Sequence, residues 1–294
     1  MKNALNYYYG LDVLNIHQKE NTFFFKHKNK EYLFTRCDIQ NINEVYETST
    51  TLNNYGVLSH KIVLNNDKQI ITKINDINYI LMEVYTERKK INLNDIIIFN
   101  NINNFGMKKI DDWYNLWTNK IDYLEYQISQ MGKKHHHIRK NFSYYVGMAE
   151  NAICLVKNIN SQNLYYSFNH RRINFNDTLQ DLYNPINFIV DLRIRDVCEY
   201  LKSCFFNKID IENELFLYLE NNNLNYDESC CFLARMLFPT YYFDIYEKII
   251  NNEIDENQIN NIIILANDYE KLIKKLYFYL KNKVNIPTIE WLTN

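Results

Sequence analysis

The stretch from Tyr165 to Leu201, YYSFNHRRINFNDTLQDLYNPINFIVDLRIRDVCEYL, decides the fold. An apolar run at Leu164–Phe168 predicts a strand, which leads into a His-Arg-Arg turn and a polar loop. A second apolar run at Pro185–Val190 predicts another strand, followed by a helix that opens at Arg195-Asp196. The polar and charged residues of this stretch are therefore concentrated between two buried strands.

This layout resembles the catalytic segment of phosphotransferases of the aminoglycoside and choline kinase type. Those enzymes carry His-x-Asp-x-x-x-x-Asn on the first loop and a metal-binding Asp, in an Ile-Asp-Trp-like run, on the second. The resemblance implies that His170 is the motif histidine, that Arg172 stands at the catalytic base and that Asp177 stands at the metal-binding Asn. A guanidinium cannot accept a proton from a substrate hydroxyl, because its pKa lies far above neutrality. Asp177 could still hold magnesium through its oxygens.

The second metal ligand depends on the register of the match. Aligning Asn187-Phe188 with the Asp-Trp of the family brings Arg195-Asp196 into place, whereas spacing from His170 favours Asp191. We prefer Asn187 at the ligand position. A neutral amide is a poorer magnesium ligand than a carboxylate, so this site is also weakened.

Composition excludes several classes of protein. The chain has 294 residues, a formal net charge of -2 and a hydrophobic fraction of 47%, which excludes a basic nucleic-acid binder and an acidic disordered chain. No apolar run reaches the roughly 18 residues of a membrane span, and the start lacks the order of a secretory signal, so synthesis in the cytoplasm is expected. Heavy use of Asn, Ile, Lys and Tyr is typical of an AT-rich bacterial genome. The cysteines show no paired metal spacing and are expected to be reduced core residues: Cys37, Cys154, Cys198, Cys204, Cys230 and Cys231.

The first part of the chain predicts strands with one helix. Aromatic runs at Thr22–Lys26 and Glu31–Arg36 predict a hairpin, and a helix is expected at Ile42–Tyr55, ended by Gly56. Further strands are expected at His60–Leu64, Gln69–Ile74 and Ile77–Tyr85.

The nucleotide-binding groups of a kinase-like small lobe are incomplete. The second strand of the hairpin normally presents a lysine to the phosphates, but Thr35 or Arg36 occupies that position; Arg36 could contact phosphate. No glycine lies between the two strands, so the phosphate-covering loop lacks an obvious backbone nest. Glu44 or Glu47 could be the helix carboxylate that pairs with the lysine. Without that lysine, both are expected to be solvated surface charges.

Helical periodicity dominates after residue 86. Val84–Lys90 carries the chain into this part, and Asp111 and Asp112 are expected to cap a helix that ends at Gly132. The KKHHHIRK segment that follows predicts a basic surface cluster, because neighbouring histidines point in different directions and cannot all bind one ion. Other elements are expected at Asn92–Phe99, Ile102–Met107, Asn141–Asn158, Ile211–Glu220, Tyr226–Leu237, Tyr241–Asn251, Asp255–Lys283 and Ile289–Leu292, with Asp227 and Asp255 as N-caps.

A sharper resemblance rests on the run Tyr-Tyr-x-Gly-x-Ala-Glu-Asn-Ala-Ile at Tyr144–Ile153, together with the later His-x-Arg and Arg-Asp positions. The chain resembles the spore coat protein family of YutH type, a branch of kinase-like proteins in which the base position is often Arg. This implies an α+β, protein-kinase-like fold of two lobes. Residues 1–86 would form a small, β-rich lobe and residues 87–294 a large, mostly helical lobe. Glu150 and Asn151 are expected to form buried hydrogen bonds to the loops around His170.

Three functions remain open, with the balance against catalysis. The first is a catalytically degenerate kinase-fold protein that serves as a structural or scaffolding component of the spore coat, without a cofactor. The second is an atypical small-molecule phosphotransferase, similar to aminoglycoside, choline or homoserine kinases, that uses ATP and magnesium held by Asp177, Asn187 or Asp191. The third is a nucleotide-sensing or phosphate-binding pseudoenzyme in which Arg36, Arg171 and Arg172 hold the anion, with Glu47 nearby. The resemblance implies other coat proteins as partners, and synthesis in the mother cell followed by location at the coat surface.

Overall fold

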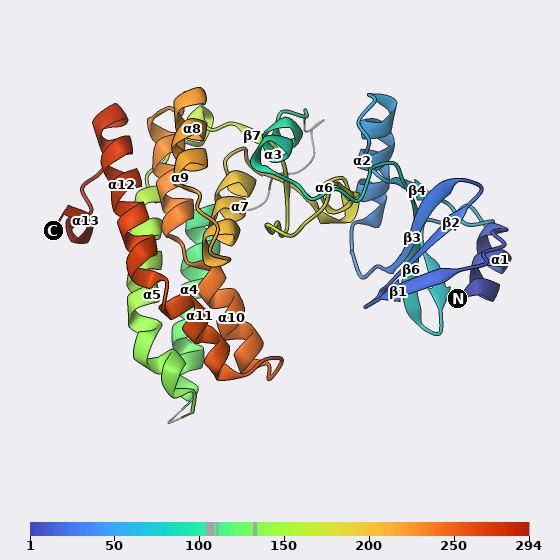
Figure 1. Cartoon of the computed structure of the whole chain (residues 1–294), viewed down its shortest axis with the longest axis horizontal. Helices are drawn as coiled ribbons and strands as arrows, with labels where there is room; N and C mark the ends of the chain where they lie inside the picture. Colours follow the sequence, from blue (N-terminus) through green and yellow to red (C-terminus); the bar gives the residue numbers. More distant parts are fainter. Residues whose placement is uncertain (104–108, 110–111, 132–133, 294) are drawn as a thin grey trace. The chain divides into compact units, whose positions relative to one another are not determined.

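The computed structural model of the chain describes residues 1–103, 109, 112–131 and 134–293. The chain forms two compact units (Figure 1). The first unit contains Met1–Asn92 together with Asn176–Ile189, and the second contains the described parts of 93–175 and 190–293. The first unit is therefore built from two segments that are far apart in the sequence.

The first unit is organised around an antiparallel sheet, which has six strands within the described residues. The strand order is β1-β2-β3-β6-β4, and β5 pairs with β6. The strands are β1 (Ile16–Lys19), β2 (Thr22–His27), β3 (Lys30–Arg36), β4 (Lys61–Val63), β5 (Thr72–Ile74) and β6 (Ile77–Val84). The helical elements of this unit are α1 (Lys2–Tyr9), α2 (Ile42–Asn54), α6 (Leu179–Leu182) and the 3-10 turn η2 (Pro185–Asn187).

The hairpin of β2 and β3 confirms the prediction made from the aromatic runs. Its turn is formed by Lys28 and Asn29, which both have positive φ, as two-residue hairpin turns favour. Side chains alternate between the two faces of the sheet. On β3, Phe34 packs in the cluster that contains Leu5 of α1, whereas Leu33 packs in the cluster that contains Ile42 of α2. The sheet is thus covered by α1 on one face and by α2 on the other.

Two elements at the start of the chain were missing from the prediction. Helix α1 ends at Gly10, and strand β1 pairs with β2 from Ile16↔Phe25 to Lys19↔Thr22. The pattern did not reveal β1, because three of its four side chains are exposed and polar. The loop between β1 and β2 is therefore Glu20-Asn21. Like the turn between β2 and β3, it contains no glycine. The strand predicted at Gln69–Ile74 is shorter in the structure, where β5 covers only its last three residues. Gly56, predicted to end the first predicted helix, lies just beyond α2 with a φ of 80°.

The second unit is mostly helical. Strand β7 (Tyr166–His170) pairs with β8 (Phe188–Leu192), of which the last three residues belong to this unit. Strand β7 begins two residues later than predicted, because Leu164 caps the 3-10 turn at Ser161–Asn163. Strand β8 begins three residues later, because the 3-10 turn η2 uses the start of the second run. The helices are α3 (Leu93–Asn100), α4 (Trp113–Gln130), α5 (His136–Val156), α7 (Arg195–Phe206), α8 (Glu212–Asn221), α9 (Tyr226–Leu237), α10 (Thr240–Ile250), α11 (Asn260–Ile263), α12 (Ala266–Val284) and α13 (Glu290–Thr293), with 3-10 turns η1 (Ser161–Asn163) and η3 (Glu256–Ile259).

Helix caps show where local sequence was sufficient. The Asp112 carboxylate accepts a hydrogen bond from the backbone N–H of Asn115 at 2.9 Å, as predicted for the start of α4. Helix α9, in contrast, begins with a capping box between Asn225 and Glu228. The predicted cap Asp227 is instead buried, and it accepts a hydrogen bond from the side chain of Asn163 at 2.6 Å. Predictions for Asp111, Gly132 and residues 104–107 lie outside the described residues.

Two predicted helices have different limits. Helix α5 begins at His136 rather than near residue 141, because the carboxylate of Glu256 caps it by accepting from the backbone N–H groups of His137 (2.7 Å) and Ile138 (3.1 Å). The long helix expected from Asp255 to Lys283 is divided into η3, α11 and α12. Asp255 caps η3 through the backbone N–H of Asn257.

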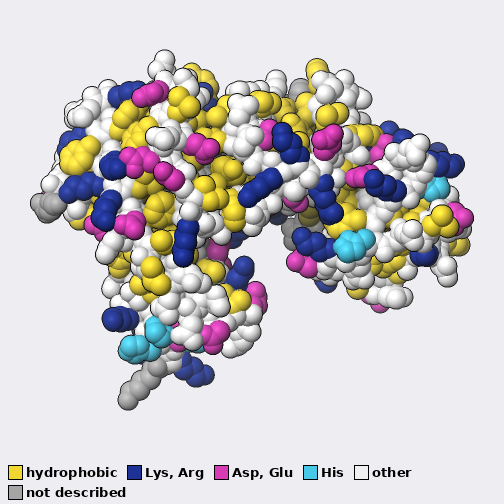
Figure 2. All heavy atoms as spheres, viewed as in Figure 1, with side chains coloured by type: hydrophobic (Ala, Val, Ile, Leu, Met, Phe, Trp, Pro, Cys, Tyr) yellow, Lys and Arg dark blue, Asp and Glu magenta, His cyan; other side chains and the backbone are white. Residues whose placement is uncertain are grey.

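The surface carries mixed charge. Basic and acidic side chains alternate over the visible face in Figure 2, in agreement with the net charge of -2. Among the described helices, none is both long enough and apolar enough to cross a membrane.

Candidate active site

His170 lies at the end of β7 and is held by the first turn of α7. Its Nδ1 lies 2.6 Å from Oδ2 of Asp196, and its backbone N–H donates to Oδ1 of the same carboxylate at 3.1 Å. The backbone N–H of Asp196 in turn donates to Oδ1 of Asn169 at 3.1 Å. All three side chains are buried. The Arg195-Asp196 helix start predicted from the sequence therefore fixes the position of the motif histidine.

Arg172, which the sequence resemblance predicts at the position of the catalytic base, extends toward solvent. Its side chain is 65% exposed, and its Nη2 donates to Oδ1 of Asp244 on α10 at 3.0 Å. Burial raises the pKa of the Asp244 carboxyl, although the neighbouring Arg172 lowers it. Arg171 is also exposed. The turn after β7 thus presents two exposed cations, Arg171 and Arg172.

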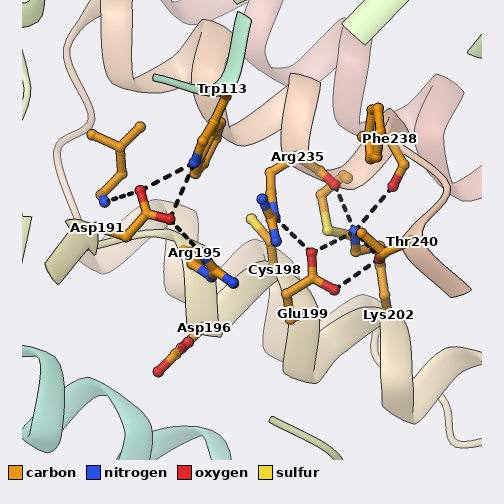
Figure 3. A network of polar contacts seen from close by, with 12 residues as sticks. Trp113, Asp191, Arg195, Asp196, Cys198, Glu199, Lys202, Arg235, Phe238 and Thr240 are labelled. Carbon is orange, nitrogen blue, oxygen red and sulfur yellow. Dashed lines mark hydrogen bonds and ion pairs between the residues drawn. The ribbon is translucent and has the colours of Figure 1, made fainter. Parts of the chain in front are cut away.

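Asp191 lies in β8, and both of its carboxylate oxygens are occupied by protein donors (Figure 3). The indole Nε1 of Trp113 lies 3.0 Å from Oδ1 and 3.1 Å from Oδ2. Arg195 donates to Oδ2 through Nη1 at 2.6 Å, and the backbone N–H of Leu192 lies 2.7 Å from Oδ1. The Asp191 side chain is only 3% exposed. The guanidinium of Arg195 therefore neutralises this buried carboxylate.

A second buried network extends from α7 to α9 and α10 (Figure 3). Lys202 is 1% exposed, and its ammonium donates to the carbonyls of Arg235 (2.8 Å) and Phe238 (3.1 Å) and to Oγ1 of Thr240 (2.9 Å). Glu199 accepts from Nε of Arg235 at 2.6 Å and lies 2.8 Å from the Lys202 ammonium. Burial alone would raise the pKa of Glu199, but Arg235 and Lys202 lower it well below its usual range. The guanidinium of Arg235 also lies 4.9 Å from the centre of a Trp113 ring, so the aromatic residue contacts both networks.

In the first unit, the structure does not bring Arg36 and Glu47 together. Arg36 follows Phe34 by two residues in β3, so it lies on the face covered by α1, and it pairs with Asp38 at 2.8 Å. Thr35 lies on the face covered by α2, and its hydroxyl lies 2.8 Å from that of Thr22. Glu47 is exposed on α2. The face of the sheet covered by α2 therefore presents Thr35, and Arg36 points to the other face.

Asp177 and Asn187 also belong to the first unit. The carbonyl of Asp177 accepts from the backbone N–H of Ile91 at 3.0 Å, and Asn187 ends the 3-10 turn η2. Both residues are half-buried. His170, Arg172 and Asp191 belong to the second unit. Within the part of the chain that is described, no group of three or more His, Cys, Asp or Glu side chains is arranged to hold a metal ion.

Sequence reasoning missed the partners of Asp191. Trp113 carried a detectable signal, because a buried indole N–H normally requires an acceptor. Lys202, within the apolar DVCEYLKSC segment, was likewise a detectable signal, because a buried lysine must be paired. The prediction for Glu150 and Asn151 was wrong. Glu150 is exposed, and Asn151 donates to the carbonyl of Gly147 in its own helix at 2.7 Å.

The fold is that of the protein-kinase-like phosphotransferases. An aminoglycoside phosphotransferase from Alicyclobacillus acidocaldarius subsp. acidocaldarius has a TM-score of 0.64 at 12% identity, covering 92% of this chain and 93% of the other. Spectinomycin phosphotransferase APH(9)-Ia, in complex with ADP and spectinomycin, has a TM-score of 0.60 at 11% identity, with coverage of 95% and 97%. Choline kinase LicA from Streptococcus pneumoniae has a TM-score of 0.53 at 13% identity, with coverage of 95% and 98%. No curated protein sequence matches the chain.

Within this class, the sequence matches one family over residues 2–276, and that family is described as "Spore coat putative kinase YutH". The chain belongs to this family. The resemblance inferred from the AENAI run and the two-lobe kinase-like fold that it implied are both confirmed.

Proposed function

We propose that this protein is a catalytically degenerate kinase-fold protein that acts as a structural or scaffolding component of the bacterial spore coat. The observation that carries the proposal is the state of Asp191. Its carboxylate is buried and is engaged by an indole, a guanidinium and a backbone N–H. A carboxylate with these partners is not available to magnesium unless they are first displaced.

The energetic cost of that displacement supports the proposal. Hydrogen bonds to a charged group are worth roughly 1.5–3 kcal/mol each, and displacement would leave the buried indole N–H of Trp113 and Nη1 of Arg195 without this acceptor. The alternative ligand position, Asn187, offers only a neutral amide. Phosphoryl transfer depends on metal ions that neutralise the phosphates and on a group that orients the nucleophile. Arg172, already paired with Asp244, cannot act as the base.

Family membership supports the location. A protein of the spore coat family is expected to associate with other coat proteins, after synthesis in the mother cell and deposition on the coat surface. A fold retained without its chemistry serves through the surfaces it presents. A fluorescent fusion in sporulating cells should therefore form a ring around the forespore, and a diffuse signal through the mother cell would contradict the location.

Calorimetric titration with ATP, with and without magnesium, tests the degenerate state. We expect no magnesium-dependent heat from the wild-type protein, from Asp177→Ala or from Asp191→Asn. Asp191→Asn is preferred to alanine because the amide preserves the shape of the side chain. Magnesium-dependent ATP binding that either substitution abolishes, in variants with unchanged circular dichroism, would overturn the proposal in favour of an active phosphotransferase.

A further inference from the structure

The second unit contains a cavity of about 320 Å³ beside the turn that follows β7. Helices α7 and α10 form much of its wall. Its volume lies at the lower end of the range of small-molecule sites, roughly 300–1,000 Å³. Six of its lining side chains are basic and two are acidic, so its electrostatic potential favours anions.

The two acidic side chains are already neutralised by the protein. Glu199 is paired with Arg235 and Lys202, and Asp244 is paired with Arg172. These pairs use most of the hydrogen-bonding capacity of the cations at the base of the cavity. Neither carboxylate is therefore an unpaired negative charge that would repel an anionic ligand.

Three other cations keep donors available. Arg171 and Lys248 are exposed, and neither forms a side-chain ion pair within the described residues. Arg195 uses Nη1 for Asp191 and Nη2 for the carbonyl of Arg171 (3.3 Å), but its Nε is buried and lacks a hydrogen-bond partner among the described residues. Guanidinium groups match the geometry of phosphate oxygens, and unsatisfied buried donors are uncommon in folded proteins.

One part of the wall is apolar and aromatic. Phe206 and Tyr241 are stacked with ring centroids 3.7 Å apart. Ile173, Ile245 and Ile262 also line the cavity. A ligand for this cavity thus needs an anionic group for the arginines and an apolar body for the aromatic wall.

We propose that this cavity binds a small phosphate monoester with an apolar or aromatic body, with Arg171, Arg195 and Lys248 contacting the phosphate. The inference concerns side chains of the second unit alone and does not depend on the loss of phosphoryl transfer. It differs from the nucleotide site expected in a kinase-like fold because all of its lining residues belong to the second unit.

Phenyl phosphate is the probe, measured by ligand-observed NMR and calorimetry in the absence of ATP and magnesium. The wild-type protein is expected to bind it at millimolar concentration or below. The double variant Arg171→Gln/Lys248→Gln should bind at least roughly tenfold more weakly, since each charge-assisted hydrogen bond accounts for about that factor. Both side chains lack partners in the described structure, so the variant should fold normally, which its melting curve without ligand will verify.

The matched control is Arg139→Gln/Lys140→Gln, which removes the same two charges from exposed positions on α5. It should bind as the wild type does. Equal weakening in both variants, no weakening in either, or no binding of phenyl phosphate would overturn the proposal. Phenol, which lacks the phosphate group, tests whether binding needs the anion. Inorganic phosphate, which lacks the ring, tests whether binding needs the apolar body. Benzoate binding as tight as phenyl phosphate would refute the phosphate assignment.

Discussion

His60 should make the stability of the first unit depend on pH. Its side chain is fully buried, and neither ring nitrogen has a hydrogen-bond partner of normal geometry, although the backbone of Gln180 lies close. Burial lowers the pKa of His60 from 6.5 to about 4, against the smaller opposing effects of Gln180 and Asp181. The folded protein thus holds a neutral imidazole that becomes protonated more readily once the chain unfolds.

The sign of the effect follows from proton binding. Between pH 6.5 and pH 4, the unfolded chain binds a proton at His60 that the folded protein does not, so stability falls as the pH is lowered through this window. The contribution is complete above pH 6.5. From a shift between these two pKa values, the free energy of unfolding should fall by about 2 kcal/mol between pH 7.5 and pH 5.0.

Urea unfolding followed by circular dichroism, at a series of pH values, measures this loss. His60→Leu removes the titrating group and its unpartnered nitrogen atoms, so its stability should be at least that of the wild type at pH 7.5 and should exceed it at pH 5.0. The control His17→Gln removes an exposed histidine of the same unit and should retain the wild-type pH dependence. If His60→Leu loses as much stability on acidification as the wild type, the argument from burial is wrong.

Three further substitutions test packing and backbone geometry. Lys202→Met should destabilise the second unit by roughly 3 kcal/mol, because it removes one of the two cations paired with Glu199 and leaves the buried carbonyls of Arg235 and Phe238 without this donor. A loss below about 1 kcal/mol, measured from urea unfolding curves of Trp fluorescence, would contradict this. Gly56→Ala should lower the free energy of unfolding by about 1 kcal/mol, because Gly56 has a positive φ. Steric clash does not contribute, since no atom lies within 4 Å of the added Cβ. Gly147→Ala, in the interior of α5 and equally free of contacts, should instead stabilise the protein by about 0.5–1 kcal/mol, and a thermal melt that ranks the two variants in the reverse order would refute the explanation.

Local patterns predicted those elements whose signals lie within one short segment. The hairpin of β2 and β3 follows from adjacent aromatic runs, and α4 follows from its apolar stripe and the Asp112 cap. Strand β1 was missed because its residues Ile16–Lys19 are mostly polar and exposed at the edge of the sheet. The cap of α9 was misplaced because Asp227 and Asn225 are both good capping residues, and only the tertiary contact of Asp227 with Asn163 distinguishes them.

The candidate site was predicted only in part, because several of its contacts join residues that are far apart in the sequence. The resemblance implied that Arg172 stands at the base position, and this assignment stays a prediction; the structure shows its guanidinium exposed and paired with Asp244. The sequence could not identify the partners of Asp191, because Trp113 lies 78 residues away and only the folded chain brings its indole to this carboxylate. Arg36 lies on the face of the sheet opposite to α2, which carries Glu47. The face on which a strand residue lies depends on strand register, because a shift of one residue moves its side chain to the other face.

The discontinuous first unit has a consequence for how the protein is made. All strands of its sheet lie within the first 92 residues, yet residues 176–189 are needed to complete the unit. The carbonyl of Tyr183 accepts a hydrogen bond from the backbone N–H of His60, and the backbone N–H of Leu179 donates to the carbonyl of Lys89. A nascent chain that has just released residue 92 from the ribosome lacks these contacts. At translation rates of about 5–20 residues per second, the missing segment follows after roughly 5–20 s. The first unit must therefore wait, incompletely folded, for a part of itself that is synthesised after much of the second.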